Sequence, residues 1–199
     1  MQPFSKYLCF VLLFVSLKSF AQKEIQDSIA SERLRLNQTH LYVLGAWAAA
    51  NIVQGSISAS NTTGKEHYVH QMNAYWNTVN LAIAGAGLYM VKKQMARHFG
   101  LADNLREQAK IEKLLLFNTG LDAAYIMTGL YLKERGTRVN SEQSQGYGTS
   151  LLIQGGFLLV LDMIQYSAHR KNGKLLDQTL SNWQLGSTQN GLGLSYRIK

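Results

Sequence analysis

TSLLIQGGFLLVLDMIQY, residues 149–166, is a long apolar stretch interrupted by glutamines and an aspartate. Three other stretches of this kind, at 41–57, 75–91 and 114–132, carry Asn, Gln or Asp among apolar residues. At about 1.5 Å per helical residue, each can nearly cross a hydrocarbon core roughly 30 Å thick, where uncompensated polar groups are costly. The sequence therefore predicts an all-α fold: an antiparallel four-helix transmembrane bundle with a polar interior.

The first residues have the pattern of an export signal. Lys6 stands in a short polar start, residues 7–17 are apolar, and Ser19 and Ala21 are small residues that suit a leader-peptidase cut after Ala21. We expect this signal peptide to be cleaved. An uncleaved anchor is the alternative, because Lys18 lies close to the cut.

The chain is expected to divide into a signal peptide at 1–21, a membrane bundle at 22–176 and a tail at 177–199. In the tail, apolar and polar residues alternate on both sides of Asn190-Gly191, a tight-turn dipeptide. This pattern predicts a short C-terminal β-hairpin.

The segments between the apolar stretches predict two kinds of connection. Residues 23–39 and 91–113 combine apolar residues at helical spacing with many charges, and Gly100 is expected to end a helix there. We expect these segments to be helical extensions outside the membrane. Residues 58–73 and 134–147 are rich in Ser, Thr, Gly, Asn and Gln and are expected to form loops.

The formal net charge is +8, which by itself would suggest a nucleic-acid partner. No nucleic-acid-binding motif accompanies the charge, and an exported membrane protein does not meet cytoplasmic nucleic acid. The expected partners are membrane lipids with anionic headgroups and, beyond them, a protein partner or further copies of the chain. Cys9 is the only cysteine, so the mature part is expected to lack disulfides and thiolate metal sites.

A cleaved leader predicts a bacterial inner-membrane protein with both mature termini in the periplasm. That orientation places most Lys and Arg residues on the outer side, which reverses the positive-inside rule. Three interpretations stay open: the leader dictates the orientation, the first segment is not a working leader, or the four stretches form a soluble periplasmic helical bundle.

Five amide side chains are expected at one level of an antiparallel bundle. They are Asn51, Gln54, Asn77, Asn80 and Gln154. Amide contacts between membrane helices contribute about 1 kcal/mol or less each. We interpret the five as an interhelical network that holds the helices together, with a ligand site as the alternative.

A second polar group combines Asn118, Asp122 and Tyr125 on one helical face with Asp162 near the same level. Two carboxylates in a low-dielectric interior cannot both ionise cheaply. A shared proton, a bound cation or a proton relay are the functional interpretations of this candidate intramembrane site. The structural interpretation is that each group is neutral or satisfied by Tyr and Asn donors, or that Asp162 reaches the interface.

No motif indicates catalysis. The sequence contains no Gly-x-Ser-x-Gly, no phosphate-binding loop and no His-Glu-x-x-His, which disfavours an enzyme. His67 and His70 could share one side of a helix, but a zinc site needs further ligands, and none is obvious nearby. We therefore predict no catalytic residues, no metal and no cofactor.

Three segments, together with the leader, carry a resemblance: NAYWNTVN (73–80), FNTGLD (117–122) and QGGFLLVLD (154–162). The pattern resembles an uncharacterised family of small four-helix membrane proteins of Gram-negative bacteria. The resemblance covers most of the mature chain and implies the fold and the location. That family has no assigned activity, so the resemblance implies no functional residues.

Two functions of different class fit these observations. The first is a non-enzymatic integral membrane protein that scaffolds or assembles partners through the basic segment 92–113 and the C-terminal tail. The second is a small transporter in which Asp122 and Asp162 bind a proton or a cation. It ranks second, because four helices without a broken segment offer little room for a transport path.

Overall fold

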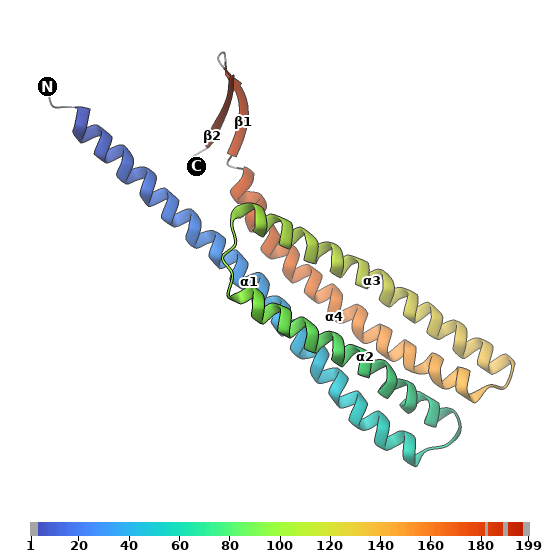
Figure 1. The fold of residues 1–199 in the computed structure, drawn as a ribbon. Helices are drawn as coiled ribbons and strands as arrows, with labels where there is room; N and C mark the ends of the chain where they lie inside the picture. The colour runs from blue at the N-terminus through green and yellow to red at the C-terminus, as the bar shows by residue number, and fades with distance from the viewer. Residues whose placement is uncertain (1–3, 182, 189–190, 197–199) are drawn as a thin grey trace.

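Four long antiparallel helices form the body of the molecule in a computed structural model (Figure 1). The structure describes the backbone of residues 4–181, 183–188 and 191–196, and the side chains of residues 27–178. The helices are α1 (Phe4–Asn61), α2 (Gly64–Met95), α3 (Leu101–Arg138) and α4 (Glu142–Ser181). The prediction of a four-helix bundle is confirmed. The backbone of α1 is helical across the expected cleavage point, and its first part extends beyond the bundle.

Two short strands follow α4. Strand β1 (Trp183–Thr188) pairs antiparallel with β2 (Gly191–Tyr196), in a register that places Thr188 opposite Gly191. The expected turn residue Asn190 lies outside the described residues.

The two predicted loops are wrong. Most of their residues belong to helices, and only short turns connect these helices. Only residues 62–63 separate α1 from α2, and only residues 139–141 separate α3 from α4. Gly64 and Asn140 have φ angles of 62° and 52°, a left-handed conformation that glycine and asparagine adopt most readily. One such residue reverses the chain within a few positions, so the neighbouring Ser, Thr and Gln residues remain helical.

The connection between α2 and α3 also differs from the prediction at Gly100. This glycine is the N-cap of α3 and has an extended backbone, whereas α2 already ends at Met95. Phe99, just before it, is buried in a small apolar cluster with Ala30, Leu34 and Val91. Burial of Phe99 therefore anchors the connection to the bundle.

Helix packing is uneven around the bundle. Helix α1 packs along α2, and α3 packs along α4, while α4 also contacts α1 and α2. The approach of α3 to α4 is close: a Cβ added to Gly148 would lie 2.6 Å from the Gly129 backbone oxygen and 2.5 Å from the Lys133 backbone nitrogen. Helices α2 and α3 have no comparable backbone approach. The bundle is thus two helix pairs joined mainly through α4, with a gap between α2 and α3.

Buried and exposed side chains are not separated by polarity in the way that is usual in water-soluble proteins. Among residues 27–178, buried polar and charged side chains outnumber buried apolar ones. Large apolar side chains point outward on every helix, among them Val53, Val79, Tyr89, Phe117, Met127, Val160 and Ile164. In the described part of the chain, α4 alone, over Glu142–Gln178, is long and apolar enough to cross a membrane by length and composition.

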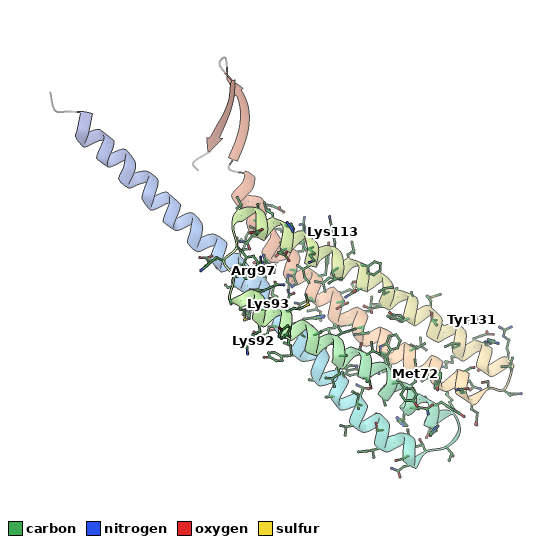
Figure 2. The ribbon with its side chains drawn as sticks, in the orientation of Figure 1. Met72, Lys92, Lys93, Arg97, Lys113 and Tyr131 are labelled. Carbon is green, nitrogen blue, oxygen red and sulfur yellow. The ribbon has the colours of Figure 1, made fainter. Side chains whose placement is uncertain are left out.

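Charged residues gather at the ends of the bundle. Figure 2 shows Lys92, Lys93, Arg97 and Lys113 near the end where α2 leads into α3, and Tyr131 toward the opposite end. Between residues 114 and 132 of α3, the only charged residue is Asp122. The outward apolar surface therefore forms a belt between two charged ends.

Candidate functional site

The gap between α2 and α3 is a cleft of about 650 Å³. Helices α1 and α4 contribute its floor, and α2 and α3 contribute its two lips. All four residues of the predicted intramembrane site line this cleft: Asn118, Asp122, Tyr125 and Asp162. The antiparallel arrangement of α3 and α4 brings the two carboxylates to neighbouring levels of the same cavity.

Asp162 has polar neighbours from two other helices. Its Oδ1 lies 3.5 Å from His40 Nε2 of α1, and the Asn118 amide donates a hydrogen bond to its carboxylate. His40 was not predicted as a site residue. It stands just before the apolar stretch of α1, and the sequence alone does not show that α1 and α4 bring it to Asp162.

Asp122 differs from Asp162 in having an unsatisfied oxygen. Its side chain is 3% exposed, and Oδ2 has no hydrogen-bond partner. Asp162 is near enough for the two carboxyl groups to interact electrostatically. A buried polar atom without a partner carries its full desolvation cost, so Asp122 is the least satisfied acidic group of the cleft.

Unsatisfied buried atoms concentrate around this cleft. Five such side-chain atoms occur among the described residues, and four belong to residues that line it: Arg33 Nη2, His40 Nδ1, Trp76 Nε1 and Asp122 Oδ2. Trp76 and Tyr125 meet edge to face across the gap, with ring centroids 4.7 Å apart. These two rings close one end of the cleft.

The other end of the cleft carries cations. Its lining includes two basic residues, Arg33 on α1 and Lys110 on α3, and one acidic residue, Glu107 on α3. Arg33 donates a 2.9 Å hydrogen bond to Asn104 Oδ1, and its guanidinium lies 4.8 Å from the centroid of the Phe99 ring. Burial lowers the pKa of Arg33, and the nearby Glu107 carboxylate acts in the opposite direction. Arginine stays charged under such conditions, so this end is positive.

A hydrogen-bond network surrounds Gln154, and its members differ in part from the five amides named from the sequence. Gln154 accepts a 2.8 Å hydrogen bond from Trp47 Nε1 and donates to Asn51 Oδ1 at 3.3 Å and Asn73 Oδ1 at 3.1 Å. Ser150 also donates to Asn73 Oδ1, at 2.5 Å. These bonds join α1, α2 and α4 at one level.

The remaining predicted amides are placed differently. Asn77 donates to the Asn73 carbonyl within α2, and Asn80 donates to Asn77 Oδ1, so both continue the network along one helix. Gln54 lies outside it. Its amide is exposed and contacts Ser58 and His70, although Gln54 stands less than one helical turn from Asn51.

A further buried polar cluster, which the sequence did not predict, joins α1, α3 and α4 near the basic end. Gln108 donates to the His169 carbonyl at 2.6 Å, and Asn172 donates to Gln108 Oε1 and to the Ile29 carbonyl, both at 3.2 Å. Side-chain hydrogen bonds therefore join α1, α3 and α4 at this end of the bundle, outside the apolar belt.

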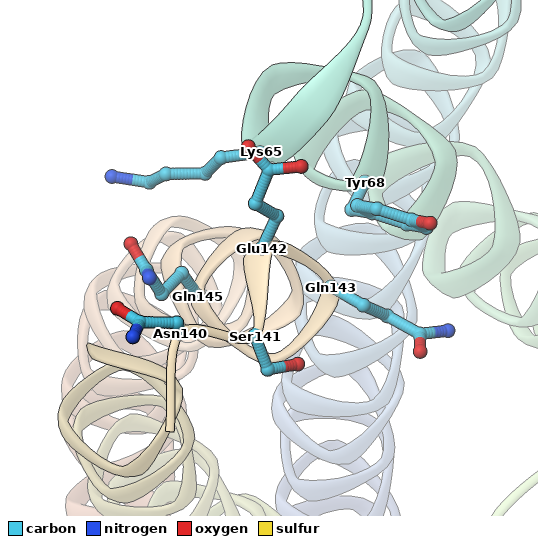
Figure 3. A pocket seen from close by; sticks show the side chains of 7 residues that line it. All are labelled: Lys65, Tyr68, Asn140, Ser141, Glu142, Gln143 and Gln145. Carbon is cyan, nitrogen blue, oxygen red and sulfur yellow. The ribbon is translucent and has the colours of Figure 1, made fainter. Parts of the chain in front are cut away.

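A second hollow lies at the opposite end of the bundle, where α2 begins beside the turn between α3 and α4 (Figure 3). Its lining is polar and includes Lys65, Tyr68, Asn140 and Gln145. The Glu142 carboxylate lies against Gly64, the first residue of α2, where negative charge stabilises a helix N-terminus. This hollow is open and has a structural explanation, so the cleft between α2 and α3 is the better candidate site.

Comparison with known proteins identifies the family of the chain. Residues 43–163 match the model of DUF6992, a family of unknown function. The match covers more than half of the chain, so the chain belongs to this family. No curated protein and no solved structure matches. The expectation of an uncharacterised family is confirmed, and the matched region contains all four predicted residues of the cleft.

Proposed function

We propose that this member of the DUF6992 family is a non-enzymatic integral membrane protein that takes part in scaffolding or assembly. Its location would be the bacterial inner membrane, with both mature termini in the periplasm, as the leader pattern predicts. One observation carries the membrane part of the proposal: buried polar side chains outnumber buried apolar ones among residues 27–178, while many large apolar side chains are exposed.

The dimensions of the apolar belt support this proposal. Residues 114–132 of α3, at about 1.5 Å per residue, extend over roughly 28 Å, close to the thickness of a hydrocarbon core. Exposed tyrosines lie toward both ends of the belt, Tyr42 and Tyr89 toward one and Tyr75 and Tyr131 toward the other, as interfacial tyrosines do. In the soluble alternative, the same belt would be a large apolar surface in water, which monomeric soluble proteins rarely expose.

The assembly role rests on the basic end of the bundle. Lys92, Lys93 and Arg97 extend from the end of α2, and Lys113 extends from α3 near the same level (Figure 2). Clustered lysines and arginines at a membrane surface attract anionic lipid headgroups and acidic protein segments. This end therefore supplies a charged contact surface outside the belt.

A charge reversal tests both parts of the proposal. In Lys92→Glu, Lys93→Glu, Arg97→Glu, we expect the protein to stay in the membrane pellet after sodium carbonate extraction but to lose its crosslinked partners. The matched control reverses Lys65, Lys133 and Arg135 at the opposite end and should keep those partners. Release of the unmodified protein by carbonate would contradict the membrane location. Unchanged crosslinks in the first variant would contradict the assembly role.

A second candidate function is a proton- or cation-coupled carrier. The observation that favours it is the position of Asp122 and Asp162 in one cleft at the depth of the belt. Purified protein in liposomes would then move protons or a cation, and Asp122→Asn together with Asp162→Asn would abolish the flux while leaving the helical content unchanged. Absence of any flux from the unmodified protein would remove this candidate and leave the assembly role.

A further inference from the structure

The cleft between α2 and α3 has apolar lips and a polar floor. Val79 and Ile83 on α2, and Leu114 and Leu121 on α3, line it and are exposed. Because α2 and α3 do not pack against each other, the cleft opens sideways between these lips. In the membrane location proposed above, this opening faces hydrocarbon.

The interior of the cleft presents polar groups that a ligand could satisfy. Asp122 Oδ2 and Trp76 Nε1 are buried without partners, whereas Asp162 has a 3.5 Å contact from His40 Nε2 besides its bond from Asn118. Native proteins rarely leave several such atoms unpaired around one cavity. Within residues 27–178, no group of three or more His, Cys, Asp or Glu side chains could hold a metal ion. Together with the apolar lips, these polar groups suit an organic ligand that has both a polar and an apolar part.

The polar and aromatic groups inside the cleft favour a ligand with a positive charge and an apolar body. Two carboxyl groups attract a cation, and Tyr125 stands one turn from Asp122 and meets the Trp76 ring. Aromatic rings beside carboxylates are the surroundings in which proteins bind organic ammonium groups. The cleft volume, about 650 Å³, is within the usual range for small-molecule sites.

The charged residues at the positive end of the cleft determine from which side a cationic ligand can enter. Arg33 and Lys110 line that end, with Glu107 as the one opposing charge. These two cations repel a positively charged ligand that would approach along the helix axes. An apolar cation can instead pass between the lips of α2 and α3 from the surrounding hydrocarbon.

We propose that this cleft binds a lipophilic organic cation, with its charge beside Asp122 and Asp162 and its apolar body between α2 and α3. The proposal names a ligand class for the carboxylates that the carrier candidate uses. It requires binding and does not require transport.

Equilibrium dialysis of the purified full chain in detergent tests the proposal, with tetraphenylphosphonium as the probe. The probe should bind saturably, and Asp122→Asn should weaken binding at least about tenfold, because the coulombic attraction between the cation and the carboxylate is lost. Asp103→Asn, an exposed substitution on α3 outside the cleft, is the matched control and should bind like the unmodified chain.

Two further measurements make the result decisive. Val79→Trp places a bulky ring on the lip without touching the carboxylates and should abolish binding even if Asp122→Asn fails to fold. Tetraphenylborate has the same shape and the opposite charge, and it should not bind saturably. Non-saturable uptake of the cation, equal binding to Asp122→Asn, or preference for the borate would each overturn the proposal. Because the assay is done in detergent, its failure is independent of the carbonate test of membrane location.

Discussion

A lysine in place of Val160 is expected to destabilise the membrane-inserted protein by about 3 kcal/mol, which is the difference between lysine and an aliphatic residue near the centre of a membrane helix. Val160 is 58% exposed, on the outer face of α4 within the belt. If lipid is the solvent there, the ammonium group must reach the interface or remain poorly solvated. We expect a lower yield in membranes and an earlier unfolding midpoint when sodium dodecyl sulfate is titrated into mixed micelles.

The control for this substitution is Val139→Lys. Val139 is 60% exposed, like Val160, but lies in the turn between α3 and α4, outside the belt. Its replacement should leave yield and unfolding midpoint unchanged. In a soluble bundle both sites would face water and both lysines would be harmless, because surface substitutions usually change stability by less than about 0.5 kcal/mol. Equal stability of the two variants would therefore refute the membrane proposal.

The second large effect is expected for Gln154→Leu. Gln154 is fully buried and hydrogen-bonds from α4 to both α1 and α2. Leucine has a similar size but leaves Trp47 Nε1 without an acceptor and Asn51 Oδ1 without a donor. At about 1–2 kcal/mol for each group left unsatisfied, the free energy of unfolding should fall by about 2–4 kcal/mol. The same detergent titration, followed by far-ultraviolet circular dichroism, measures this change.

Gln54→Leu is the matched control, since the same substitution is made on a glutamine that faces the surface. It should change stability by less than about 0.5 kcal/mol. Combining Gln154→Leu with Trp47→Phe removes the stranded donor as well as the acceptor, and it should recover part of the loss in a double-mutant cycle. If Gln54→Leu lowers the free energy of unfolding as much as Gln154→Leu does, the hydrogen bonds around Gln154 do not account for the stability of the bundle.

Sequence patterns located the helices better than their ends. Long apolar stretches identified all four helices, because helix length and composition are local properties. The ends were misplaced at the two short connections, where composition suggested loops of more than ten residues. A single residue with positive φ, Gly64 in one connection and Asn140 in the other, reverses the chain, and the flanking polar residues stay helical. Composition measures polarity, and a polar helix end has the composition of a loop.

The candidate site could be predicted in part. Asn118, Asp122 and Tyr125 share a helical face by their spacing, so their grouping follows from the sequence. His40 and Trp76 could not be assigned to the same cavity, because their positions depend on how α1 and α2 are rotated about their axes. The sequence shows only that His40 stands just before one apolar stretch and that Trp76 stands just inside another.

The sequence by itself determined that this protein has four long helices with polar residues embedded in apolar stretches, since both properties are set by residues near one another in the chain. Only the tertiary structure decided which helices touch. Gly129 and Gly148 allow α3 to lie against α4, while the backbones of α2 and α3 stay apart, although the rings of Trp76 and Tyr125 meet across the gap. The cleft, and with it the unsatisfied oxygen of Asp122, arises from that unequal packing, because close contact depends on the surfaces of two helices at once and no single stretch contains it.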